Sequence, residues 1–303
     1  MTLLIFGAAG FVGRNLVNLL LEKKEQIIAT DVTDNPFAAT VPYVKLDVLD
    51  RSKVADVAKK SDTIIHLAAS PLTVSLQDPA TNMRINIEGT LNILDAARKH
   101  GVKKVVYSSA SSVVGDVTHD ARSFVTRVSE DLPCSPKTPY AVAKKACEDY
   151  LRVYSAIFGL NYLVFRFFNV YGPGQRSGLI PNIYSALAGG KTFTVQGDGS
   201  SVRDFIYVGD VAEFCYSAVK LPDVKNTVVN LGTGLGTSIK EALSVASEIL
   251  HVTPQIAYQP ARPGEIGNFV ADTTRIKQLF GKTPSTTLRE GLEETFSWLG
   301  KSA

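Results

Sequence analysis

The chain has 303 residues, 45% apolar and 20% charged, which are the proportions of a soluble globular protein of about two domains. This composition excludes a disordered chain, a fibre and a small protein held together by disulfides. The net charge is +3 and no long basic run occurs, so the charge pattern of a nucleic-acid-binding protein is missing. No apolar stretch is long enough to span a membrane, so neither nucleic acid nor membrane is expected as a partner.

The cysteines Cys134, Cys147 and Cys215 lie far apart, and the four histidines show no spacing typical of metal ligands. We therefore expect no metal site. Free thiols are typical of a reducing compartment, which indicates a cytoplasmic location.

Short apolar segments alternate with helical patterns through the first half of the chain. Strands are predicted at residues 2–6, 26–30, 43–46, 63–67, 104–108 and 161–167, and helices at 11–24, 81–100 and 140–158. Strands that are apolar throughout and separated by helices predict an α/β fold with a parallel sheet covered on both faces.

After residue 172 the pattern changes to short helices, short strands and turns rich in glycine and proline. We predict a first domain over residues 1–172 and a smaller α/β substrate lobe over 173–303. Segments near 205–235 are expected to return to the first domain. Pockets commonly form between two lobes, and the substrate is expected there.

A glycine-rich turn with Gly7, Gly10 and Gly13 joins the first strand to the first helix. Glycines allow a tight turn and close backbone approach, and the N-terminus of a helix offers free N–H groups to a pyrophosphate. Asp31 ends the second strand, where an acid bonds the adenosine ribose hydroxyls and repels a 2′-phosphate. The sequence therefore predicts a dinucleotide site and favours NAD over NADP.

Other cofactor contacts are expected where the glycine turn and later strands end. Segments 47–48 and 66–69 follow the third and fourth strands, and small side chains in the second let a cofactor lie against the backbone. Taken alone, each segment is equally typical of ordinary packing. The further residues predicted to bind NAD are Phe11, Val12, Asp47, Val48, Leu67, Ala68 and Ala69.

Tyr140 and Lys144 stand at the start of a predicted helix, one turn apart on one face. A phenol with a pKa of about 10 is a poor base at neutral pH. An ammonium about 4 Å away contributes roughly 4 kcal/mol at an effective dielectric of 20, enough to lower the phenol pKa by a few units. The pair is therefore a candidate acid/base centre.

The order of these motifs resembles the extended short-chain dehydrogenase/reductase family, and in particular its NAD-dependent epimerase/dehydratase branch, which includes UDP-glucose 4-epimerases. The resemblance extends over essentially the whole chain. The motifs that carry it are residues 7–13, Asp31, 66–69, 86–90, Tyr140 with Lys144, 166–173, 197–206 and 262–265.

This resemblance implies a Rossmann-type doubly wound parallel sheet with bound NAD. Tyr140 is then the acid/base on a sugar hydroxyl, and Lys144 holds the nicotinamide ribose. Asn86 is implied to orient this lysine, and Ser108 and Phe167 are implied to lie against the cofactor.

The resemblance also implies a nucleotide-diphosphate sugar as the substrate. Asn169, Arg203 and Arg262 match positions that hold its diphosphate. Two guanidinium groups and an amide suit a diphosphate in both geometry and charge.

Ala110 stands where the family usually carries a serine or threonine beside the tyrosine, and alanine has no hydroxyl. Three explanations are open: a one-residue shift that brings in Ser109, a hydroxyl supplied from further along the segment, or a dispensable hydroxyl with reduced or lost activity. Side chains alternate along an extended segment, so residues 110 and 112 face the same way. We favour Ser112, with Ser111 next.

Family dehydratases carry Asp and Glu where this chain has Ser111 and Ser112. Elimination of water needs a general base and a general acid, and two serines supply neither. Glu130 and Asp131 are nearby in sequence, and we expect their loop to be exposed. Dehydration is therefore disfavoured.

Epimerisation needs only reversible hydride transfer at C4 through a 4-keto intermediate, with Tyr140 taking and returning the proton. The leading prediction is an NAD-dependent nucleotide-sugar 4-epimerase of the UDP-glucose/UDP-galactose type. Phe269 falls where epimerases control the room for a 2-acetamido group, and a bulky ring favours the sugars without one. The alternatives are a dehydratase or 4-keto reductase of the same branch, and a non-catalytic NAD-binding sensor.

Related proteins pair through the helices predicted at 81–100 and 140–158, so the resemblance implies a homodimer built on a four-helix bundle. These helices each have a second apolar stripe. Leu91, Leu94 and Tyr154 are expected to face the partner molecule.

Overall fold

The computed structural model describes residues 1–115, 125–260 and 268–301, and the chain divides into two compact units. Unit 1 comprises Met1–Gly115, Pro133–Phe167 and Ala212–Val229, and unit 2 comprises the rest. The predicted division had placed residues 125–132 in the first domain. They fall in unit 2 because β6 (Thr126–Val128) pairs in parallel with β15 (Phe269–Ala271).

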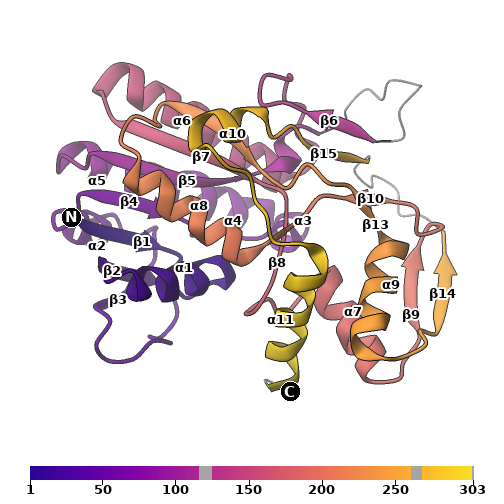
Figure 1. Cartoon of the computed structure of the whole chain (residues 1–303). Helices are drawn as coiled ribbons and strands as arrows, with labels where there is room; N and C mark the ends of the chain where they lie inside the picture. The colour runs from indigo at the N-terminus through magenta and orange to yellow at the C-terminus, as the bar shows by residue number, and fades with distance from the viewer. Residues whose placement is uncertain (116–124, 261–267, 302–303) are drawn as a thin grey trace. The chain divides into compact units, whose positions relative to one another are not determined.

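A seven-stranded sheet forms the centre of unit 1, in the strand order β12-β7-β5-β4-β1-β2-β3 (Figure 1). Each neighbouring pair from β7 to β3 is parallel. The inner strands are buried along nearly their whole length, as a sheet covered on both faces requires. The strands are β1 (Thr2–Phe6), β2 (Gln26–Asp31), β3 (Tyr43–Lys45), β4 (Thr63–His66), β5 (Lys104–Ala110), β7 (Asn161–Phe167) and β12 (Thr227–Leu231).

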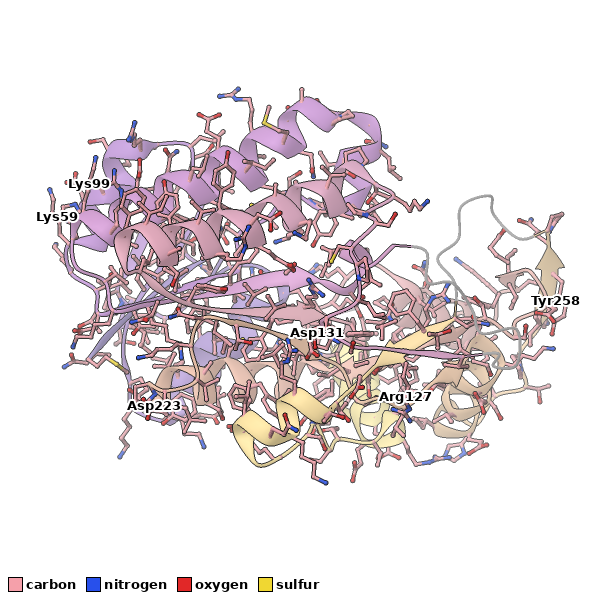
Figure 2. The ribbon with its side chains drawn as sticks, turned by 90° about the horizontal axis from the view of Figure 1, so that it is seen from above. Lys59, Lys99, Arg127, Asp131, Asp223 and Tyr258 are labelled. Atoms are coloured by element: carbon pink, nitrogen blue, oxygen red, sulfur yellow. The ribbon has the colours of Figure 1, made fainter. Side chains whose placement is uncertain are left out.

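Helices cover both faces of this sheet (Figure 1). On one face, α2 packs against α5 and α5 against α6, and Lys59 and Lys99 mark the neighbouring ends of the first two (Figure 2). On the other face, α1 contacts α8 through Lys23 and Glu213. The helices are α1 (Phe11–Glu22), α2 (Arg51–Ala58), α3 (Leu72–Gln77), α4 (Pro79–Met83), α5 (Gly89–Lys99), α6 (Pro139–Phe158) and α8 (Val208–Lys220), with short turns η1 (Arg84–Glu88) and η2 (Ser111–Val113).

The helix predicted at 81–100 is present as a continuous helical run over residues 79–99, but it is not regular, because a π-helical turn, η1, lies between α4 and α5. The carbonyl oxygen of Asn86 in this turn accepts the hydroxyl of Thr90 and the thiol of Cys147. Side-chain donors thus occupy a carbonyl that regular helix geometry would pair with a backbone N–H. Such wide turns occur most often at functional sites.

Unit 2 has short strand pairs around a core of buried residues that includes Tyr171, Ile183, Phe205, Leu243 and Phe296. Its pairs are β8 with β11, β9 with β14, β10 with β13, and β6 with β15. The elements not yet given are β8 (Asn169–Tyr171), α7 (Leu179–Ala188), β9 (Phe193–Gln196), β10 (Val202–Arg203), β11 (Phe205–Tyr207), β13 (Thr237–Ser238), α9 (Ile239–Leu250), β14 (Ile256–Gln259), α10 (Thr274–Phe280) and α11 (Leu288–Lys301).

The structure confirms the Rossmann-type α/β fold, with a parallel sheet between two layers of helices. Within the described residues, no helix combines the length and apolar character that a membrane span needs.

Candidate active site

The glycine turn after β1 leaves no room for a side chain at Gly7 or at Gly13. Gly7 has a φ of +83°, and a Cβ atom there would lie 2.5 Å from the backbone nitrogen of Ala68. A Cβ atom on Gly13 would lie 2.1 Å from the carbonyl oxygen of Gly7. The turn therefore brings bare backbone to the start of α1, and no side chain caps this helix at Gly10. Its N-terminal N–H groups are the kind of site that binds a pyrophosphate.

Asp31 ends β2 at the same edge of the sheet. One of its carboxylate oxygens accepts the backbone N–H of Ala9 at 3.0 Å, and the other accepts the N–H of Thr33 at 3.2 Å. These bonds fix the carboxylate beside the glycine turn. That arrangement suits a ribose whose hydroxyls donate to the carboxylate.

A cavity of about 480 Å³ opens at this edge of unit 1. Eight of the predicted cofactor residues line it: Gly7, Gly10, Asp31, Asp47, Val48, Leu67, Ala68 and Ala69. The remaining predicted cofactor residues, which are outside its lining, are Phe11, Val12, Gly13, Asn86, Ser108, Tyr140, Lys144 and Phe167. Sequence reasoning missed Thr30, Thr33, Ser70 and Pro71, which also line the cavity. These four residues could have been predicted from the sequence, because each stands next to a motif residue at the end of a parallel strand.

Tyr140 and Lys144 lie in the first turns of α6. Pro139 occupies the first turn of this helix and Thr138 caps it by accepting the N–H of Ala141, so the sequence fixes where the helix begins. The ammonium of Lys144 donates to the carbonyl oxygen of Ser108 at 2.7 Å and lies 5.7 Å from the centre of the Tyr140 ring. The predicted pair is thus brought together against the end of β5.

The predicted effect of Lys144 on the phenol does not appear in the chain by itself. Burial raises the pKa of Tyr140 to about 12, because the charged phenolate loses its water. Burial also lowers the pKa of Lys144 to about 8. The predicted lowering of the Tyr140 pKa is missing for a geometric reason. The ammonium of Lys144 bonds a backbone carbonyl and makes no hydrogen bond to the phenol within the described contacts.

A buried ion pair fixes α6 on the sheet one turn beyond Lys144. Arg166 of β7 donates two hydrogen bonds to Glu148 of α6, at 3.0 and 2.8 Å, and both side chains are buried. The hydroxyl of Ser109 donates to the same carboxylate at 2.5 Å. Ser109 therefore faces Glu148 inside the unit, which weighs against the one-residue shift as the replacement for Ala110.

Ser111 and Ser112 lie in the short 3-10 turn η2, so the segment after Ala110 is not extended, and the alternation of side chains that favoured Ser112 does not apply. The hydroxyl oxygen of Ser112 is buried and has no hydrogen-bond partner among the described residues. Ser108, two residues before Ala110, donates to the carbonyl oxygen of His66 at 3.1 Å. Ser109 is committed to Glu148, whereas the hydroxyl of Ser112 is buried and has no such commitment.

Asn86 lies in the π turn η1 and is buried. Its side-chain amide accepts the N–H of Ser70 at 2.8 Å and donates to the carbonyl oxygen of Ser70 at 3.0 Å. It thus fixes the loop after β4 that lines the cavity, and its predicted role toward Lys144 stays a prediction. Phe167 ends β7 in register with Ala110 of β5.

The predicted diphosphate residues lie in unit 2. Asn169 is exposed and donates to the carbonyl oxygen of Asp204 at 3.2 Å, next to Arg203, so the structure brings this pair together. The guanidinium of Arg203 donates to Ser201 and Val202 at 2.9 Å. Asp204 itself is fully buried and holds the backbone of Thr233, Gly234 and Ala271. Arg262 lies outside the described residues.

Phe269 begins β15 in unit 2 and is buried. Its ring lies 5.9 Å from that of Phe168 in an edge-to-face arrangement. Glu130 is also buried, contrary to the expectation of an exposed loop, because its carboxylate accepts the N–H of Asn230 at 2.8 Å. Asp131 is exposed and is bonded by Arg275 at 2.7 Å.

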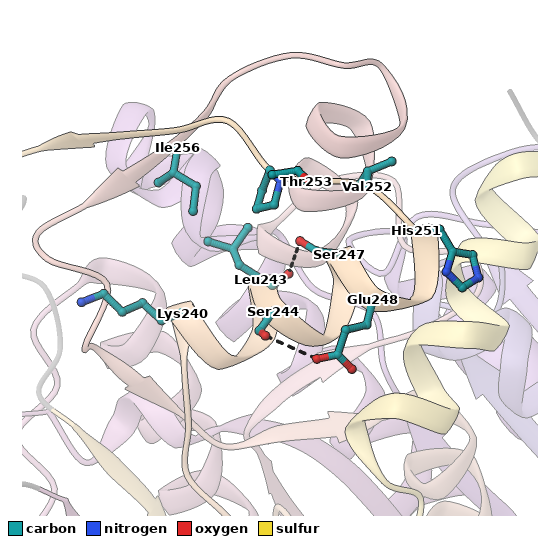
Figure 3. A pocket seen from close by; sticks show the side chains of 10 residues that line it. Lys240, Leu243, Ser244, Ser247, Glu248, His251, Val252, Thr253 and Ile256 are labelled. Atoms are coloured by element: carbon teal, nitrogen blue, oxygen red, sulfur yellow. Dashed lines mark hydrogen bonds between the residues drawn. The ribbon is translucent and has the colours of Figure 1, made fainter.

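A second hollow lies along α9 of unit 2, and its lining residues come from this helix and from the segment that follows it, up to Ile256 (Figure 3). Ser247 bonds the backbone of Leu243 within its wall, and Ser244 contacts Glu248. None of the predicted site residues lines this hollow. The described residues also contain no group of three or more histidine, cysteine or acidic side chains suited to a metal ion.

The fold and the glycine turn are those of the extended short-chain dehydrogenase/reductase class, and the Tyr140–Lys144 pair fits the same class. Residues 3–232 match the model of the NAD dependent epimerase/dehydratase family, and the chain belongs to that family. The family confirms NAD as the cofactor, and the bare glycine cradle fits it.

Similar proteins cover the chain almost completely. It is 32% identical to a UDP-glucose 4-epimerase of Mycolicibacterium smegmatis, with 97% of each chain covered. Among solved structures, a UDP-glucose 4-epimerase of Thermotoga maritima with UDP-glucose has a TM-score of 0.92 at 29% identity, covering 100% of this chain and 99% of that one. One from Thermus thermophilus in complex with NAD has a TM-score of 0.90 at 30% identity, with 100% of both chains covered.

Relatives with other reactions are similar to the same extent. A dTDP-glucose 4,6-dehydratase of Streptomyces griseus is 30% identical over 99% of this chain and 94% of its own length. The comparisons thus establish a nucleotide-sugar epimerase or a related dehydratase, and the chain's own residues must separate the two.

Proposed function

We propose that the protein is an NAD-dependent nucleotide-sugar 4-epimerase that interconverts UDP-glucose and UDP-galactose. The observation that carries the proposal is the Tyr140–Lys144 pair at the end of β5, followed by Ala110, Ser111 and Ser112. This set supplies one proton carrier and no carboxylate, which is what a reversible oxidation and reduction at C4 needs.

Each residue of the pair has a separate task. Bound NAD supplies a reversible acceptor for the hydrogen on C4 of the sugar. Lys144, held by the carbonyl oxygen of Ser108, would donate a hydrogen bond to the nicotinamide ribose. Tyr140 takes the proton of the C4 hydroxyl. It returns this proton after the 4-keto sugar has rotated to present its other face. Positive charge on Lys144 and on the cofactor favours the phenolate, against the raised pKa that burial produces.

Dehydration would need a general base and a general acid near the sugar. Ser111 and Ser112 supply neither. Among the described residues, the nearest acid in sequence with a buried carboxylate is Glu130. It accepts the N–H of Asn230 and lies 3.7 Å from Arg275. These commitments support epimerisation over the elimination that the dehydratase relative performs.

We assign the hydroxyl beside Tyr140 to Ser112. Its buried oxygen has no partner among the described residues, whereas Ser109 is committed to Glu148. A buried hydroxyl without a partner is costly, and a bound sugar hydroxyl would satisfy it. Ser111 is the second choice.

In unit 2, we assign Asn169, Arg203 and Arg262 to the substrate diphosphate, and Phe269 to the space around C2 of the sugar. The neighbouring positions of Asn169 and Arg203 support the first assignment. The bulk of the Phe269 ring, braced by Phe168, supports a preference for a 2-hydroxyl over a 2-acetamido group.

We also propose a homodimer through α6 and its neighbours. Of the expected contact residues, Leu94 is corrected, because it is fully buried in the core. Leu91 and Tyr154 are half-buried and stay predictions. A different stripe supports the pairing, because adjoining helices α3, α4 and α6 of unit 1 leave large apolar side chains exposed. They are Leu72, Leu76, Met83, Val142, Tyr150, Val153, Ile157 and Phe158. The free thiols of Cys134, Cys147 and Cys215 support a cytoplasmic location.

The direct test is incubation of the purified chain, without added cofactor, with UDP-glucose and separately with UDP-N-acetylglucosamine, followed by proton NMR. We expect UDP-galactose from the first and little conversion of the second. A product with a 6-deoxy methyl signal would replace the proposal with a dehydratase. No conversion even with added NAD would favour a non-catalytic NAD binder, as the missing hydroxyl at Ala110 suggests.

A further inference from the structure

Lys144 is an ammonium placed almost entirely out of water. Its side chain is 2% exposed, and its one protein hydrogen bond within the described contacts goes to the carbonyl oxygen of Ser108. An ammonium has three N–H donors, so this bond leaves two directions to be satisfied. One of them faces an aromatic ring: the nitrogen lies 4.8 Å from the centre of the Tyr107 ring. That distance is within the range of a favourable cation–π interaction.

Tyr107 is rigidly placed for this contact. It lies in β5 between His66 of β4 and Val164 of β7, and its side chain is 1% exposed. Its ring packs against the His66 ring with centroids 5.3 Å apart. Strand β5 therefore holds the face of the Tyr107 ring in a fixed position next to the Lys144 ammonium.

We propose that Tyr107 is a positioning residue whose ring face holds the Lys144 ammonium in place and keeps it charged. The ring acts through Lys144 and touches no reacting atom. It leaves one ammonium donor for the bound cofactor. Only the kinetic consequence of this proposal rests on the proposed epimerase function.

The titratable groups around Lys144 leave the ring as its main fixed partner. Burial lowers the pKa of Lys144 to about 8, and Cys147 and Glu148 on α6 oppose this shift only in part. The Glu148 carboxylate is already paired with Arg166. On β4, burial and the nearby ammonium lower the pKa of His66 to about 3, so its imidazole is neutral. On α6, Tyr140 is a neutral phenol because burial raises its pKa.

The hydroxyl of Tyr107 has a different neighbour from its ring. Its oxygen is buried near Cys147 without a hydrogen-bond partner among the described residues, and burial raises the pKa of this phenol well above its usual range. The ring and the hydroxyl can therefore be tested separately. Tyr107→Phe removes the hydroxyl and keeps the ring, whereas Tyr107→3,4,5-trifluorophenylalanine keeps the ring's shape and cancels most of its quadrupole.

The decisive experiment measures the pKa of Lys144 in the full-length, NAD-loaded protein by NMR of lysine labelled at the side-chain nitrogen, with Lys144→Met assigning the signal. We expect Tyr107→Phe to keep the wild-type value. The trifluorinated variant should bind the lysine proton about 3- to 30-fold more weakly, the range of a buried cation–π contact. The same fluorinated residue in place of Phe193, a buried aromatic of unit 2, controls for fluorination itself.

The kinetic arm uses conversion of UDP-glucose by the same variants. The trifluorinated variant should lose kcat, with the loss beginning at lower pH than in the Tyr107→Phe variant, while KM for the sugar stays unchanged. A common Lys144 pKa in all three proteins would overturn the proposal. Failure of the wild-type protein to convert any nucleotide sugar would instead overturn the proposed function. The NMR measurement of the Lys144 pKa would still test the role of Tyr107.

Discussion

The two units hold their assigned functional residues by different means. In unit 1, Gly7 and Gly13 are closed in by backbone atoms, and Lys144 is buried between a strand carbonyl and an aromatic ring. In unit 2, Asn169 is exposed, and the half-buried Arg203 donates hydrogen bonds to Ser201 and Val202 beside it in the chain.

This difference has a chemical meaning. Groups that touch the cofactor and move a proton must be fixed to a fraction of an ångström before the substrate arrives. Groups that hold a flexible, charged diphosphate need charge and reach more than rigidity. We therefore expect changes in unit 1 to act on kcat and on bound NAD, and changes in unit 2 to act on KM.

The largest effect is expected for Tyr140→Phe. Removal of the proton carrier should lower kcat for UDP-glucose conversion by about 10³-fold or more, in the range of lost general acid–base catalysis. Bound NAD, measured by absorbance after release from the denatured protein, should stay at the wild-type level. An active Tyr140→Phe variant would remove this residue from the mechanism.

Gly13→Ala tests the glycine cradle. The added Cβ atom would lie 2.1 Å from a carbonyl oxygen that cannot move freely, so bound NAD should be lost and the unfolding free energy should fall by about 1–3 kcal/mol. Gly10→Ala is the matched control, because its Cβ atom would meet the same oxygen at 3.3 Å. Its fall in unfolding free energy should be much smaller. An equal fall in both variants would contradict the cradle.

Ser112→Ala should reduce kcat by about 10-fold, the cost of one lost hydrogen bond to a reacting group. Ser111→Ala, in the same turn, should have a weaker effect. If Ser111→Ala proves the more damaging change, the assignment of the hydroxyl passes to Ser111.

Arg203→Leu tests the expectation that changes in unit 2 act on KM. Loss of a guanidinium bonded to the diphosphate should raise KM for UDP-glucose by about 10-fold, with kcat and NAD content little changed. Asn169→Ala should act in the same direction with a smaller effect. A fall in kcat at unchanged KM would show that unit 2 takes part in the chemical step.

The smallest effect concerns pH. Burial lowers the pKa of Lys144 to about 8, so its ammonium loses its proton as the pH rises through this value, and kcat should fall on the alkaline side. Lys144→Arg keeps a positive charge at every accessible pH, so it should lower the rate overall but flatten this alkaline fall. Circular dichroism over the same range separates the effect from unfolding. An unchanged alkaline fall in Lys144→Arg would assign it to another group.

The sequence was sufficient for features with a regular period or a steric requirement. Apolar runs predicted the buried strands, and the spacing of Gly7, Gly10 and Asp31 predicted the cavity that they line. Tyr140 and Lys144 lie on one turn of a helix because their separation and the preceding Thr138-Pro139 cap require it.

Features that depend on tertiary contacts were beyond the sequence. The π turn at Asn86 requires donors from Thr90 and Cys147, and the second of these is brought in by another helix. The burial of Glu130 depends on Asn230, 100 residues further along. The raised pKa of Tyr140 arises from desolvation, which helical spacing does not reveal.

The measurement that tests the central claim most directly follows UDP-glucose carrying deuterium at C4, incubated with the purified protein and no added cofactor. If resident NAD takes and returns the same hydrogen, the UDP-galactose formed will keep its deuterium at C4, and none will appear in the solvent. Loss of the label to solvent, or a product altered at C6 in place of UDP-galactose, would contradict a 4-epimerase built on Tyr140 and Lys144.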